Sequence, residues 1–166
     1  MKRYLYEMST ELKMSYLDKV TFMNHVKHFA KRNLGISSDN TPYMLESYKL
    51  ADDTNGSCTY YEDDDTTTLL YVNIRQELPL CQMISTILHE TKHVQQHINK
   101  PLYFRFAHKI KTILEKHNLY DGIFYFYALH EISARRYARK MMKKYHKELN
   151  ALIEKAYNNE LDELLY

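Results

Sequence analysis

The chain has 166 residues, of which 45% are hydrophobic and 27% charged, and this size suits one domain, residues 1–166, with one core. Its 23 Lys and Arg nearly balance its 21 Asp and Glu, so the formal charge of +2 does not indicate a nucleic-acid-binding protein. Because the sequence lacks a long apolar run, a signal-peptide pattern and a disulfide framework, we expect a cytoplasmic protein that does not contact membranes.

The first half of the chain predicts one helix and a hairpin. Apolar residues recur at helical spacing over residues 14–33, and Gly35 ends the pattern. Residues 57–61 and 66–74 are rich in side chains that suit strands, and we expect them to pair around the acidic segment 62–65. That segment lacks the Gly and the closing Glu of a calcium loop, so we interpret it as a solvated turn.

The second half of the chain predicts a run of helices. Proline is well placed to open a helix, so we expect helices from Pro79 to residue 98 and from Pro101 to residue 117. A third long helix is expected over residues 123–145, and the remainder also has a helical pattern. The predicted fold class is therefore α+β and mostly helical, with a small antiparallel or mixed sheet followed by helices.

The helix from Pro79 contains the pattern HExxH, at His89, Glu90 and His93. Residues four apart on a helix lie one turn above each other, so both imidazoles can reach one Zn²⁺ while Glu90 faces a metal-bound water. On a helical wheel the two histidines lie nearly opposite the apolar stripe of this helix. The alternative interpretation is two solvent-exposed histidines on a polar face, and a third ligand is needed to decide.

Glu131 is the candidate third ligand. It lies in the middle of the apolar stripe of the predicted helix 123–145, where an unpaired carboxylate would cost several kcal/mol. It must therefore meet a cation, either as a salt bridge to Lys or Arg or as the third ligand of a His–His–Glu zinc site. Ala134 and Ala138 favour the zinc site, because small residues beside Glu131 allow a close approach to the HExxH helix.

The two motifs together resemble those of the gluzincin metallopeptidases. The segment 89–96, HETKHVQQ, is followed 38 residues after His93 by EISARRYA, which begins at Glu131, and this combination is most similar to the small ImmA/IrrE-type peptidases of bacteria and their mobile elements, including phages. The resemblance covers residues 57–140 and implies a zincin-like fold. It also implies that His89, His93 and Glu131 bind zinc and that Glu90 is the general base.

The resemblance has further implications and one departure. Many such proteins carry Asn or Asp four residues after the third ligand, whereas this chain has Arg135, so the hydrogen-bond acceptor for a ligand histidine is missing or comes from elsewhere. As donors to a developing oxyanion, Tyr127 and Arg135 rank ahead of Tyr137 and His130, which point further round the helix. The resemblance also implies that residues 69–74 bind an extended peptide by strand addition.

The function predicted from the sequence is peptide-bond hydrolysis by a zinc metallopeptidase, acting as a regulatory protease on a protein or peptide substrate. The alternative is a non-catalytic interaction protein on the same scaffold, with zinc structural or absent. A basic run over residues 135–147 raises nucleic-acid binding as a third hypothesis. We interpret that run instead as a solvated face, salt-bridged at i, i+4 spacing, and do not expect a nucleic-acid partner.

Overall fold

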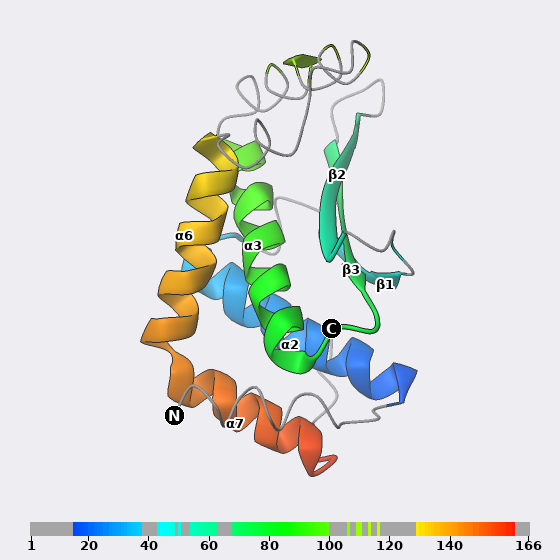
Figure 1. Cartoon of the computed structure of the whole chain (residues 1–166), viewed down its shortest axis with the longest axis vertical. Helices are drawn as coiled ribbons and strands as arrows, with labels where there is room; N and C mark the ends of the chain where they lie inside the picture. The colour runs from blue at the N-terminus through cyan, green and yellow to red at the C-terminus, as the bar shows by residue number, and fades with distance from the viewer. Residues whose placement is uncertain are drawn as a thin grey trace.

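The computed structural model describes residues 15–37, 43–48, 50, 54–62, 68–99, 106, 109–110, 113, 116 and 129–161. Within these residues the chain is α+β and mostly helical, which confirms the predicted fold class. Figure 1 shows one helix, α3, between the sheet on one side and helix α6 on the other. The molecule therefore has a central helix whose two sides are both covered.

Helix α2, Tyr16–Leu34, agrees with the predicted helix 14–33 to within two residues. Ser15 caps its first turn, because its hydroxyl accepts a hydrogen bond from the backbone N–H of Asp18 at 3.2 Å. Gly35 ends the helix in the left-handed conformation with φ 65°, where glycine has no steric penalty. Gln95 of α3 donates to the carbonyl of Leu34 at 2.7 Å, which ties the two helices together.

The sheet has three strands in the order β1-β3-β2. Strands β2, Gly56–Glu62, and β3, Thr68–Arg75, pair antiparallel, which confirms the predicted pairing, although residues 63–67 of the acidic turn lie outside the described residues. Strand β1, Tyr43–Tyr48, was not predicted, and it pairs parallel to β3. The prediction that residues 69–74 bind a peptide by strand addition is wrong, because both edges of β3 are already paired.

Helix α3, Leu80–Asn99, follows Pro79 as predicted. It packs against strands β2 and β3 and also against helices α2 and α6. Its apolar stripe faces the sheet and α2 and forms the centre of the core. The side that was expected to be polar carries the two histidines of the HExxH motif, and α6 covers it. The interpretation of two solvent-exposed histidines is therefore wrong, since His93 is buried and His89 is half-buried.

Two helices follow in the described C-terminal part. Helix α6, Leu129–Lys144, and helix α7, His146–Tyr157, meet at a turn at Tyr145 and confirm the predicted helical pattern within their bounds. The start of the predicted helix 123–145 lies outside the described residues. So does most of the helix predicted over residues 101–117, of which five separate positions are described as helical. None of the described helices is long and apolar enough to cross a membrane.

The core joins all of these elements around α3. It includes residues of every described helix and of β3 that are at most 3% exposed: Phe22, Met23, Val26, Leu70, Val72, Ile74, Met83, Ile84, Ile87, Leu88, Val94, Ala138, Leu149 and Ile153. Ala134 and Ala138 on α6 are both buried, as their small size requires where α6 approaches α3 closely. This approach brings Glu131 to the HExxH motif.

Candidate metal centre

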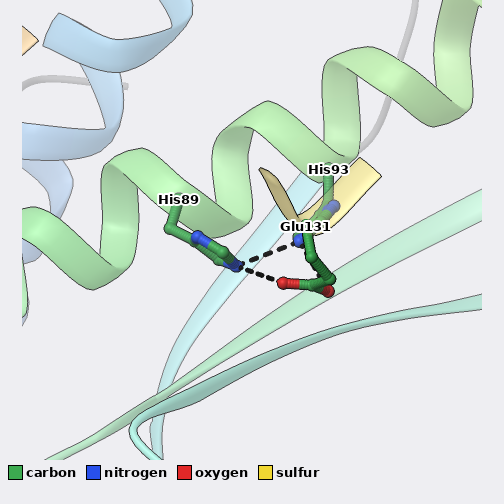
Figure 2. A group of neighbouring side chains, drawn as sticks. All are labelled: His89, His93 and Glu131. Carbon is green, nitrogen blue, oxygen red and sulfur yellow. Dashed lines mark hydrogen bonds and ion pairs between the residues drawn. The ribbon is translucent and has the colours of Figure 1, made fainter. Parts of the chain in front are cut away.

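Three side chains from two helices converge at the contact between α3 and α6. Figure 2 shows His89 and His93, one turn apart on α3, directed at the carboxylate of Glu131 on α6. The two helices are separate in sequence, so the group depends on the tertiary packing. It is also the only group of metal-ligating side chains of this kind among the described residues.

The distances in the group are those of a metal site. The Nε2 atoms of His89 and His93 are 3.1 Å apart. Glu131 places Oε2 3.2 Å from His89 Nε2 and Oε1 3.2 Å from His93 Nε2. Zinc bonds of about 2.0–2.1 Å hold neighbouring tetrahedral ligand atoms about 3.4 Å apart. Each imidazole is therefore near this spacing from the other and from one carboxylate oxygen, and one potential ligand atom from each residue lies within 4.8 Å of the other two.

A glutamine fixes the orientation of one imidazole. Gln96 donates from its amide nitrogen to the backbone carbonyl of His130, 3.1 Å away, and a carbonyl can only accept. The amide oxygen of Gln96 must then face His93 Nδ1, 2.9 Å away, so Nδ1 carries the proton and donates it. The Nε2 atom of His93, which faces His89 and Glu131, is then the nitrogen that can give up its proton and offer a lone pair to a metal ion.

The electrostatics of the group also favour a bound cation. Burial would raise the pKa of Glu131, but hydrogen bonds with His89 and His93 hold it well below its usual range. Burial would lower the pKa of His93, but the hydrogen bond with Glu131 and the charge of Glu90 raise it overall. The group therefore attracts positive charge, which a metal ion can supply in place of a proton.

Glu90 lies beside the three candidate ligands without being part of the group. Its side chain is buried, and its Oε1 is 3.9 Å from His89 Nε2, further than any distance within the group. Burial raises the pKa of Glu90, the charge of Glu131 adds to this effect, and the two histidines oppose it. A carboxyl group with a raised pKa next to a metal site is suited to accept and return a proton near neutral pH.

Strand β2 begins against this part of α3, and a glycine makes the close approach possible. A Cβ atom on Gly56 would lie 2.5 Å from Thr86 Cγ2 and 3.2 Å from Glu90 Cγ. The first distance is shorter than real contacts allow, so any larger residue must push the strand and the helix apart. Gly56 therefore holds the edge of the sheet next to Glu90.

We expect Gly56→Ala to destabilise the protein by about 1–3 kcal/mol, as overpacking in a buried contact does. Thermal unfolding of the single variant and of Gly56→Ala combined with Thr86→Ser measures this effect. Because serine lacks the methyl group that clashes, the second change should recover most of the loss. A Gly56→Ala variant as stable as the wild type would contradict the described contact.

Two residues near the group have positions that the sequence did not predict. Gln96 replaces the acceptor that Arg135 cannot provide, and no motif distinguishes it from its neighbour Gln95. His130 was expected to point away, but its Nε2 is 3.7 Å from Glu131 Oε1 and its ring centroid is 5.7 Å from that of His93. Of the preferred oxyanion donors, Arg135 is half-buried on the next turn and Tyr127 lies outside the described residues.

We expect Gln96→Leu to weaken zinc binding by about 10–100-fold, which is typical when the hydrogen-bond partner of a ligand histidine is lost. The affinity can be measured by competition with a chromophoric chelator. Gln95→Leu is the matched control, because Gln95 bonds to Leu34 of α2 and not to the site. Equal affinities of the two variants would show that Gln96 does not orient His93.

Comparisons with protein-family models, with curated proteins and with solved structures find no match to this chain. The functional conclusion therefore depends on the geometry and chemistry of the site.

Proposed function

We propose that the protein is a zinc-dependent peptidase whose site consists of His89, His93 and Glu131 as ligands and Glu90 as general base. The observation that carries this proposal is the convergence of three candidate ligand side chains with a second carboxylate, the buried side chain of Glu90, beside them. A purely structural zinc site has four protein ligands, whereas three ligands and an open position are typical of catalytic zinc. The gluzincin resemblance of the two motifs supports the same proposal and extends it to a zincin-like fold.

In the proposed reaction each residue of the site has a different role. His89, His93 and Glu131 would hold the zinc ion, which would supply a Lewis acid for the peptide carbonyl and for the attacking water. Glu90 accepts the proton of the attacking water and returns it to the leaving amine. Gln96 keeps the Nδ1 proton on His93, so that Nε2 remains available as a ligand. Each of these roles needs the contact between α3 and α6 to be intact.

His130 is the best placed donor for the developing oxyanion. Its ring lies against His93 and its Nε2 is 3.7 Å from Glu131, on the side of the group from which α6 approaches. An imidazole N–H at this position can donate to an oxygen that develops negative charge next to the metal ligands. We therefore assign this role to His130 in place of Arg135, which is a turn further along α6.

The open edge of β2 is the proposed binding surface for an extended peptide. The inner edge of β2 pairs with β3, and no other described strand pairs with its outer edge. The strand starts beside Glu90, because Gly56 contacts that residue and Thr86. A peptide that adds to this edge as a further strand is held by main-chain hydrogen bonds and passes the site.

The test is hydrolysis of pooled fluorogenic peptides by the zinc-loaded protein, with cleavage sites read by mass spectrometry. Hydrolysis should cease with a chelator, return with zinc and be absent from Glu90→Gln. It should fall in His130→Ala, which retains all three ligands. Zinc binding without any hydrolysis, or hydrolysis that Glu90→Gln retains, would favour the non-catalytic interaction protein.

A further inference from the structure

One segment of the chain, which covers most of α6 and the start of α7, contains basic residues and no acidic ones. Residues 132–147 hold seven of the 23 Lys and Arg and none of the 21 Asp and Glu. The rest of the chain has 16 Lys and Arg against 21 Asp and Glu, so it carries a net charge of −5 against +7 in this segment. The small overall charge therefore conceals a strong separation of charge.

The structure places these cations together on the solvent side of α6. We define the basic face as five exposed residues, Arg136, Arg139, Lys140, Lys143 and Lys144. At about 100° per residue they lie opposite the buried side that carries Ala134 and Ala138. Figure 1 shows α6 at the outside of the molecule, with α3 along one side of it. The basic face is therefore accessible, and it points away from the metal ligands.

The expected salt bridges do not neutralise this face. Neighbours at i, i+4 are like charges in the pairs Arg136–Lys140, Arg139–Lys143 and Lys140–Lys144, and such pairs repel. Glu148 is the acid one turn after Lys144, but it is bound to Arg32 of α2 at 2.7 Å. Among the described residues, no ion pair is made by any member of the basic face. The basic face is thus solvated as predicted, but the predicted salt bridges are absent from its five cations within the described residues.

The composition of the basic face and its surroundings indicates which class of anionic partner fits it best. Protein interfaces and membrane-inserting helices need several apolar or aromatic anchors, whereas α6 has one large exposed apolar residue, Leu129 at its first position. Single-stranded nucleic acid is held by stacking on exposed aromatic rings, but the tyrosines of this segment, Tyr137 and Tyr145, are half-buried. A duplex backbone needs only cations at regular intervals, and α6 provides them at each turn of about 5.4 Å.

We propose that the basic face of α6 binds the sugar–phosphate backbone of duplex nucleic acid without sequence preference. Arg and Lys contacts to phosphates provide affinity and orientation but do not read bases. The face carries no Asn or Gln for base recognition. Because it lies on the opposite side of α6 from Glu131, this binding is independent of the proposed peptidase activity and can operate with or without metal.

The experiment measures binding of a labelled DNA duplex of about 20 base pairs, and of the same duplex as RNA, between about 50 and 200 mM salt. The test variant combines Arg136→Gln, Arg139→Gln and Lys143→Gln. The matched control removes three exposed cations elsewhere, by Lys109→Gln, Lys116→Gln and Lys155→Gln. We expect the test variant to lose at least about tenfold in affinity and the slope of log K against log salt to fall by about 2–3, while the control stays within about twofold.

Several results would overturn this proposal. They are the absence of binding to either duplex at the lowest salt, an equal loss of affinity in the control variant, and a salt slope that the test variant leaves unchanged. Tighter binding of polyglutamate or of phosphatidylserine vesicles than of both duplexes would assign the face to an acidic protein or to a membrane surface instead. All substitutions are at exposed positions, and circular dichroism checks that each variant is folded.

Discussion

Glu90→Gln is expected to abolish peptide hydrolysis and, in the zinc-free protein, to raise the melting temperature. A general base contributes about 10²–10⁴ in rate, so its removal should bring hydrolysis to background. The amide has nearly the same size and carries no charge, and Glu90 is not a ligand, so zinc content should not change. The activity and the stability of the variant therefore move in opposite directions.

The gain in stability follows from the raised pKa of Glu90, which burial causes. The folded protein binds this proton more tightly than the unfolded chain, so Glu90 favours folding below the ordinary Glu pKa of about 4.3. That contribution is lost as the pH rises through the raised pKa of the folded state. At neutral pH the buried carboxylate is destabilising, and its replacement should stabilise the protein by on the order of 1 kcal/mol, or about 2–4 °C.

The matched control is Glu154→Gln, which makes the same change at an exposed position of α7 and should alter neither property. Melting temperatures are measured in chelator, because a metal ion would compensate the charge of Glu90. A Glu90→Gln protein that melts below the wild type at pH 7 would contradict the description of Glu90 as a buried carboxyl group whose pKa is raised by burial.

Zinc is expected to stabilise the wild type strongly and Glu131→Gln hardly at all. A ligand at 100 times its dissociation constant stabilises the folded state by about 2.7 kcal/mol. For a chain of this size that corresponds to a rise in melting temperature of about 5–11 °C. Glu131→Gln keeps the shape of the side chain but removes the negative charge between His89 and His93, so the rise should fall below about 2 °C.

His130→Ala is the control in this experiment, because it removes a side chain near the proposed ligands that is not itself a proposed ligand. His130 lies next to Glu131 in the sequence and near it in space, but its nitrogen is further from the carboxylate than those of the ligand histidines. The variant should retain the zinc-dependent rise. If His130→Ala lost the rise and Glu131→Gln kept it, the assignment of ligands on α6 would be wrong.

Local patterns explain which elements could be predicted. Helices α2 and α3 have regular apolar spacing and clear ends at Gly35 and Pro79, and the structure confirms both. Strand β1 has only six residues, and its parallel pairing with β3 joins distant parts of the chain. For the same reason the order of the strands, and with it the open edge at β2, could not be derived from the sequence.

The residues of the candidate site also differ in how far the sequence could predict them. The spacing of His89 and His93 within one helix brings their Nε2 atoms together in the structure, because helix geometry is local. Glu131 was identifiable because a carboxylate in an apolar stripe requires a partner. The contacts of Gln96 and His130 could not be predicted, because their positions depend on how α6 packs against α3. The burial of the polar side of α3 by α6 also depends on that packing.

The most direct test of the proposed site is the metal content of the purified protein after zinc is supplied and excess zinc removed. Elemental mass spectrometry would compare the wild type with His93→Ala and Glu131→Ala, each checked for retained fold. We predict about one zinc ion per chain in the wild type and none in either variant. No zinc in the wild type, or zinc retained without Glu131, would contradict the three-ligand site on α3 and α6.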